Sequence, residues 1–118
     1  ELKELRERAT LEEDLNELAK AGDPAKTVYV CHTPPYETKL DLMHGRRHIG
    51  SPALRAFIET HQPPLTLHGH VHESPHISGA ITDSIGVTVC VNPGDSRTKL
   101  RAVLVNPADP SSAQRAPS

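Results

Sequence analysis

Hydrophobic residues in the first 21 positions recur at helical spacing, but they do not form one continuous stripe. Leu2 and Leu5 fall on one side of a helical wheel, whereas the three later leucines fall on the opposite side. The break comes at Thr10, which begins a Thr-Leu-Glu-Glu run that matches a capping box. The pattern predicts an N-terminal helical segment over residues 1–21, in which a new helix begins at Thr10 and ends at Gly22.

Two short apolar runs predict neighbouring strands with a helix between them. Residues 27–31 and 65–67 are rich in β-branched residues or leucine and are bounded by turn residues. Between them, Ser51 is a candidate N-cap, apolar side chains recur at i, i+3 and i+4, and Pro63 ends the pattern. A strand-helix-strand unit places its two strands side by side in one sheet. Residues 36–50 have no periodicity and predict a long exposed loop.

The second half of the chain predicts strands without helices. Residues 77–92 are typical of two strands with a turn near Asp83, and residues 100–105 predict another strand after the turn at Asn92. Residues 106–118 hold three prolines and no large apolar residue, so they predict a disordered tail. The fold class is therefore α/β passing into antiparallel β, in a layered sandwich or part of one.

Length and composition allow one small domain, which the pattern places at residues 22–105. The 118 residues are 36% hydrophobic and include three aromatics, and the net charge of −2 argues against a groove for nucleic acid. No run of ten apolar residues exists, so no membrane span is expected. Cys31 and Cys90 lie inside apolar runs, which favours reduced core thiols of a cytoplasmic protein over a disulfide.

Histidine is the unusual feature of the composition, with eight residues in 118. His70 and His72 follow Gly69 just after the second predicted strand, and His32 ends the first one. Neutral imidazoles at the ends of neighbouring strands suit a divalent metal ion. The turn at Gly69 leaves open whether His70 and His72 face one ion or separate ions. Each histidine alone is typical of an ordinary loop residue, but the three together favour a metal site.

The sequence around these histidines resembles the C-terminal half of the calcineurin-like metallophosphoesterases. The similarity rests on His32 with the Thr-Pro-Pro that follows it, the Gly-His-Val-His-Glu run at 69–73, and a strand leading into Asn-Pro-Gly at 92–94. It spans residues 27–105. The resemblance implies half of a four-layer α/β/β/α sandwich that holds two divalent metal ions between its sheets.

The resemblance also implies the chemistry. His32 and His70 would bind one ion and His72 the other, the ions being Mn, Fe, Zn or Mg, and the activity would be hydrolysis of phosphomonoester or phosphodiester bonds. Two such ions bind phosphate oxygens and lower the pKa of the attacking water. The substrate is a phosphoester, and nucleic acid, although not indicated by the charge, stays among the possible substrates.

Motifs from the first half of that family are missing from this sequence. No Asp-x-His, no Gly-Asp-x-x-Asp and no Gly-Asn-His occurs. The chain is therefore expected to be inactive alone, with its site completed by an N-terminal half in the same polypeptide or another chain. The alternative is a non-catalytic metal-binding or scaffold module, since three histidines alone can hold one Zn²⁺ with an open position. A third reading is an interaction protein that keeps the fold without metal.

Weaker signals point to substrate contact in the predicted loop. Arg46 and His48 lie there, and Ser51 begins a helix whose free N–H groups can bind an anion. A solvated pair of loop arginines is the alternative. His44 is ambiguous, and the remaining histidines are expected to be structural: His61, His68 and His76.

Overall fold

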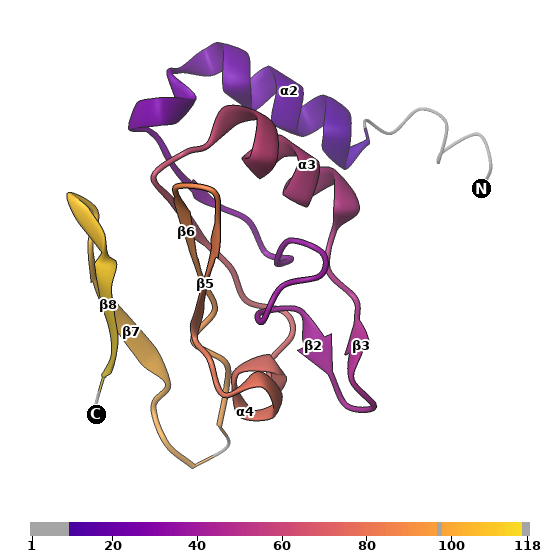
Figure 1. Ribbon diagram of the computed structural model, residues 1–118, viewed down its shortest axis with the longest axis vertical. Coiled ribbons are helices and arrows are strands. Elements are labelled where there is room, and N and C mark those ends of the chain that lie inside the picture. The colour runs from indigo at the N-terminus through magenta and orange to yellow at the C-terminus, as the bar shows by residue number, and fades with distance from the viewer. Residues whose placement is uncertain (1–9, 97, 117–118) are drawn as a thin grey trace.

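The computed structural model describes residues 10–96 and 98–116 and shows a mixed α/β architecture. Figure 1 shows two helices lying side by side over a central sheet, with a small hairpin on one side and a longer hairpin standing apart on the other. The sheet has the order β1-β4-β6-β5, from Val28–Val30, Leu65–Leu67, Thr88–Val91 and Thr82–Ile85. β1, β4 and β6 are parallel, and β5 runs antiparallel to β6.

Both helices begin at the caps that the sequence predicts. Helix α2, Leu11–Ala21, has the capping box of Thr10 and Glu13, and it ends at Gly22. Helix α3, Pro52–His61, begins after Ser51, whose hydroxyl accepts a hydrogen bond from the third helical N–H. A one-turn 3₁₀ helix, Pro24–Lys26, then leads from α2 into β1. The helix predicted over residues 1–9 lies outside the described residues.

The core lies between these helices and one face of the sheet. The register places Tyr29, Thr66 and Cys90 on that face, because they pair across the three parallel strands. Apolar side chains from α2, α3, the sheet and the loop before α3 meet there: Leu15, Leu40, Leu54, Phe57, Ile58 and Ile85. Burial raises the pKa of the Cys90 thiol to about 11, and neither cysteine forms a disulfide, as predicted.

The other face of the sheet is partly open. Val28 and Val30 point away from the helices, and they are 38% and 77% exposed. Both valines lie on the edge strand β1, and valine side chains are more often buried than exposed. Among the described residues, no helix is long and apolar enough to cross a membrane.

The predicted exposed loop at 36–50 is confirmed for the exposure of residues 44–49 and wrong for the segment before them. Leu40, Asp41 and Leu42 are buried, and the segment forms a small hairpin of β2, Leu42–Met43, and β3, Arg47–His48. The segment has no hydrophobic period because its order comes from a buried carboxylate, that of Asp41, which binds several backbone N–H groups.

The turn predicted near Asp83 is also misplaced. A short helix, α4 at Ser74–Ser78, replaces the first part of the predicted strand region and ends at Gly79. β5 contains Asp83, and the turn to β6 falls at Gly86, whose φ is 59°. The side-chain oxygen of Gln62 accepts a hydrogen bond from the next backbone N–H, that of Val87, and so fixes this turn from the end of α3.

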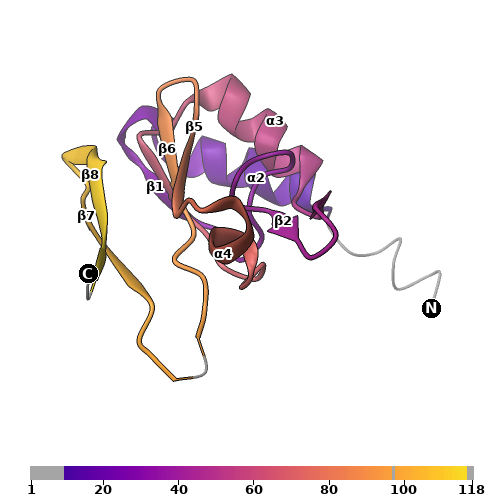
Figure 2. The ribbon, with the colours of Figure 1, turned by 60° about the horizontal axis from the view of Figure 1, so that its bottom comes forward.

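The predicted disordered tail is wrong for residues 109–116. β7, Ala102–Asn106, pairs with β8, Asp109–Ala116, in an antiparallel hairpin. The backbone ladder needs no large apolar side chain, and the Asn106 carboxamide accepts a hydrogen bond from Ala108 N to fix the turn. The predicted domain end at residue 105 therefore falls inside a strand. Figure 2 shows that this hairpin stands beside the sheet rather than within it.

Candidate functional site

His32 and His70 lie where the parallel strands β1 and β4 end. Hydrogen bonding continues beyond the strands, from Cys31 N to Leu67 O at 2.9 Å and from Gly69 N to His32 O at 3.0 Å. The two segments that carry the histidines are therefore held side by side. This follows the sequence prediction that neighbouring strands bring the first histidine close to the Gly-His-Val-His run.

The two imidazole rings face each other. His32 Nε2 lies 3.0 Å from His70 Nδ1, and the ring centroids are 4.7 Å apart. The backbone at His70 is left-handed, with φ 61°, and the Val71 N–H closes a three-residue turn onto Gly69 O at 2.6 Å. A positive φ costs a non-glycine residue about 1–3 kcal/mol, and such strain gathers at functional sites.

The donor set fits part of a divalent metal site. With one ring nitrogen protonated, the His32–His70 contact is a hydrogen bond. With these two nitrogens unprotonated, each offers a lone pair, and an ion that lies to one side of the line joining them can bind both. Two imidazole nitrogens bound to one ion at about 2.1 Å lie about 3.0 Å apart when they coordinate at a right angle. The observed separation is compatible with two ligands of one ion.

His72 faces a different partner. Its Nδ1 lies 3.9 Å from a carboxylate oxygen of Asp95, and its backbone oxygen accepts a hydrogen bond from Asp95 N at 3.3 Å. Gly94 allows this approach, because a Cβ on Gly94 would lie 3.0 Å from His72 O and 2.9 Å from the Pro75 ring. Across residues 10–96 and 98–116, no three His, Cys, Asp or Glu side chains gather as a metal would need. His72 therefore does not join the His32–His70 pair.

Asn92 ties the neighbouring turns together. It is buried, and its amide donates to Leu40 O and Val71 O, both at 3.0 Å. Its side-chain oxygen accepts from Gly94 N at 3.0 Å. One side chain therefore connects the loop before α3, the histidine turn and the turn that carries Asp95.

His68 is structural, as the sequence suggests. It is 7% exposed, with Nδ1 against the carbonyl oxygens of Cys31 and Thr33 and Nε2 2.7 Å from Thr66 Oγ1. Burial lowers the pKa of His68 to about 4. The two carbonyl contacts favour the charged form and oppose this shift, but burial is the larger effect. The ring therefore stays neutral near pH 7 and braces β1 against the end of β4.

This pKa predicts a loss of stability in mild acid. Between pH 6.5 and about 4 the unfolded chain binds a proton at His68 that the folded chain does not bind, so the free energy of unfolding falls as pH falls. A shift of this size corresponds to about 3 kcal/mol. Urea unfolding at pH 7 and pH 4.5, in the presence of a metal chelator, measures this fall in the free energy of unfolding. The His68→Gln variant should lose clearly less stability over that interval; an equal loss would contradict the assignment to His68.

The weaker substrate-binding candidates have different surroundings. Ser51 is used as the N-cap of α3. His48 Nδ1 lies 2.6 Å from the carboxylate of the buried Asp41. His48 and the exposed Arg46 line a hollow of about 540 Å³ beside α4, and this hollow does not include Ser51.

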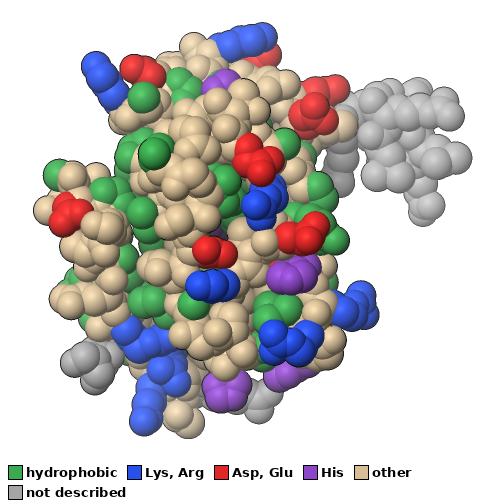
Figure 3. Space-filling model, viewed as in Figure 1, with side chains coloured by type: hydrophobic (Ala, Val, Ile, Leu, Met, Phe, Trp, Pro, Cys, Tyr) green, Lys and Arg blue, Asp and Glu red, His purple; other side chains and the backbone are tan. Residues whose placement is uncertain are grey.

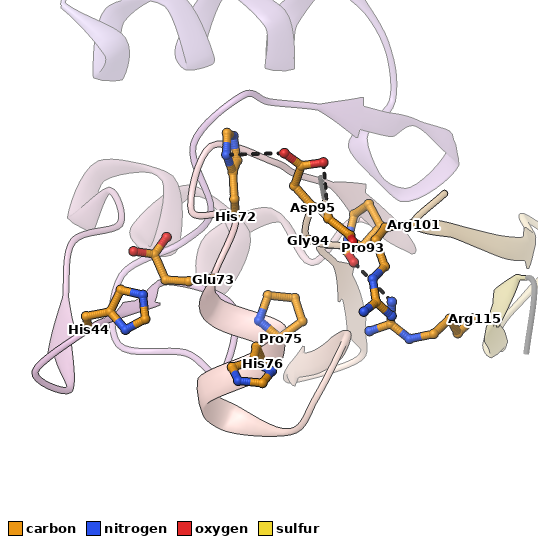
Figure 4. Close-up of a pocket in the computed structure, with 11 residues that line it drawn as sticks. His44, His72, Glu73, Pro75, His76, Pro93, Gly94, Asp95, Arg101 and Arg115 are labelled. Carbon is orange, nitrogen blue, oxygen red and sulfur yellow. Dashed lines mark hydrogen bonds and ion pairs between the residues drawn. The ribbon is translucent and has the colours of Figure 1, made fainter. Parts of the chain in front are cut away.

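A second hollow, of about 470 Å³, lies next to His72 and holds residues that the sequence did not suggest. Figure 4 shows His72 and Asp95 on one side and the guanidinium groups of Arg101 and Arg115 on another. Arg101 precedes β7 and Arg115 belongs to β8. Arg115 lies in the region predicted to be disordered, and no local sequence motif marks Arg101 or Arg115.

Comparison with known proteins gives one structural likeness. No family model and no curated protein matches the chain. A solved crystal structure is similar at 26% sequence identity and a TM-score of 0.53, over 68% of this chain and 29% of the other. The likeness supports the α/β arrangement, and the chain spans less than a third of the length of that structure.

Proposed function

We propose that this chain is the C-terminal half of a dinuclear metallophosphoesterase that hydrolyses phosphomonoester or phosphodiester bonds. The observation that carries the proposal is the 3.0 Å approach of His32 Nε2 and His70 Nδ1 at the ends of two parallel strands. The left-handed backbone at His70 adds to it, since such strain gathers at functional sites.

In this proposal His32 and His70 hold one ion, and His72 holds the other. When bound, the ions supply positive charge to the phosphate and lower the pKa of the attacking water. The neutral imidazoles bind without cancelling that charge. The Asp95 carboxylate lies 3.9 Å from His72 Nδ1, too far for a hydrogen bond, and its negative charge favours a proton on that nitrogen and leaves the other nitrogen for the ion.

The remaining ligands come from outside the described residues. A metallophosphoesterase site needs a bridging carboxylate. In the intact protein this carboxylate would come from an N-terminal half that packs as the second sheet of an α/β/β/α sandwich. The partly open face with Val28 and Val30 supports a second layer there. The greater length of the similar crystal structure is consistent with this.

The test is elemental analysis of the full-length gene product together with hydrolysis of bis(p-nitrophenyl) phosphate. We expect two divalent ions per chain, and turnover that a chelator abolishes and that added Mn²⁺, Zn²⁺ or Fe²⁺ restores. The 118-residue chain, assayed in parallel, should be inactive. One tightly bound Zn²⁺ without hydrolysis would instead indicate a metal-binding scaffold, and a metal-free, inactive protein would refute both.

A further inference from the structure

The β7–β8 hairpin brings two arginines to one face. Val103 pairs with Arg115 across the hairpin, and Arg101 comes two residues before Val103. Arg101 directly precedes β7, and the two-residue alternation of the strand, continued by one residue, places it on the face of Val103 as a diagonal neighbour of Arg115. Figure 4 shows the two guanidinium groups side by side near Pro93 and Gly94.

Both arginines face the hollow beside His72. Arg115 Nη1 donates to Pro93 O at 3.4 Å, which holds its guanidinium against the turn that carries Asp95. Ser96 adds a hydroxyl to the same hollow. The volume of about 470 Å³ is within the range of small-molecule sites.

The two guanidinium groups lack a carboxylate partner within the part of the chain that the structure describes. The ion pairs there involve other cations, and the Asp95 carboxylate faces His72 rather than either arginine. Two adjacent unpaired cations repel each other, and a bound oxyanion relieves that repulsion. In Figure 3, basic and histidine side chains lie at both the upper and the lower end of the visible face, and no acidic side chain of the described residues is visible at its lower end.

The hollow includes His72 but neither His32 nor His70. An anion held by the arginines therefore lies on the His72 side of the histidine pair, away from the ion that His32 and His70 would share. We propose that Arg101 and Arg115 bind a second anionic group of the substrate, separate from the phosphoryl group that is hydrolysed. The substrate class is then a phosphoester with a further phosphate or carboxylate, an assignment that rests on the proposed function.

The first measurement is binding of inorganic pyrophosphate to the metal-free full-length protein by calorimetry. The Arg101→Gln/Arg115→Gln variant should bind at least about tenfold more weakly, because charge-assisted hydrogen bonds are lost. The matched control is Lys26→Gln/Lys99→Gln, which removes two exposed charges that do not line the hollow. Arg101→Gln alone keeps the Arg115–Pro93 contact, so weaker binding in that variant excludes movement of the hairpin as the cause.

The second measurement compares propane-1,3-diol bisphosphate with p-nitrophenyl phosphate as substrates of the metal-loaded protein. The double arginine variant should raise KM for the bisphosphate at least about tenfold, with kcat unchanged, and should alter KM for p-nitrophenyl phosphate little. Equal pyrophosphate binding by the wild type and the arginine variant would overturn the anion site. Loss of that binding in the variant of a protein that hydrolyses neither these two substrates nor bis(p-nitrophenyl) phosphate would support the anion site and refute the proposed phosphoesterase.

Discussion

The His70→Ala variant of the full-length protein is expected to lose one metal ion per chain and more than about 100-fold of its kcat/KM. Changes to groups that only orient metal ligands already cost about 10–100-fold in affinity or activity, and His70 is proposed as a ligand itself. Elemental analysis measures the metal content, and initial rates on bis(p-nitrophenyl) phosphate measure kcat/KM. His32→Ala should behave in the same way, because the two rings converge on one position.

The backbone of His70 requires a second variant. Its φ of 61° strains alanine as well as histidine, so His70→Ala tests the imidazole and the turn together. His70→Gly removes the imidazole and suits the turn, and it should lose as much metal and activity as the alanine variant. His61→Gln, at the end of α3 against Phe57, is the control and should keep both. Two bound ions with normal turnover in His70→Gly would contradict the ligand assignment.

Local signals in the sequence were enough to predict the framework of the site. Ser51 and the periodicity that follows it fix the start of α3, and short apolar runs fix β1 and β4. A strand-helix-strand unit has one favoured way to close, so the two strands had to be neighbours. The approach of His32 to the histidine turn followed from that topology without any side-chain information.

The conformation of the histidine turn was beyond the reach of the sequence. Gly69 was expected to supply the sharp bend, since glycine adopts positive φ most easily. The structure instead has the positive φ at His70. The choice depends on hydrogen bonds to a distant segment, because Gly69 N is engaged by His32 O. Periodicity and turn propensity carry no information on such a bond.

The same limit applies to polar groups that are satisfied over long sequence separations. Ser74 Oγ donates to Lys39 O, and Leu42 N donates to Ser74 Oγ, over separations of 35 and 32 residues. These bonds bury a segment that looks like a solvated loop. Arg101 and Arg115 were missed for a related reason: backbone pairing, which leaves little trace in composition, orders the hairpin that brings them to the site.

Asp41 organises that buried segment, and its replacement by alanine is expected to reduce the free energy of unfolding by at least about 3 kcal/mol. The carboxylate is 0% exposed and accepts from the backbone N–H groups of Glu37, Thr38 and Gly50 at 2.9–3.0 Å. It also meets His48 Nδ1 at 2.6 Å. Each buried donor left without a partner costs about 1–3 kcal/mol, against a total of about 5–15 kcal/mol for a domain.

Urea unfolding of two further variants separates the backbone bonds of Asp41 from its contact with His48. His48→Ala removes only the imidazole, which is 36% exposed, and should cost about 1 kcal/mol. Asp109→Ala, at an exposed hairpin turn, should change stability by less than about 1 kcal/mol. If Asp41→Ala costs no more than His48→Ala, the three backbone bonds do not hold the segment.

The effect of Asp41 should extend to the proposed metal site, because the segment that Asp41 holds packs against the residues after His32. A Cβ on Gly50 would lie 2.6 Å from Pro34 O, and Ser51 N donates to the same oxygen at 2.9 Å. Release of Gly50 from Asp41 therefore frees the chain that follows His32. In the full-length protein, Asp41→Ala should bind the first ion more weakly than Asp109→Ala does, even below the temperature at which it unfolds. Equal metal affinity in the two variants would show that His32 is positioned by the strand β1 alone.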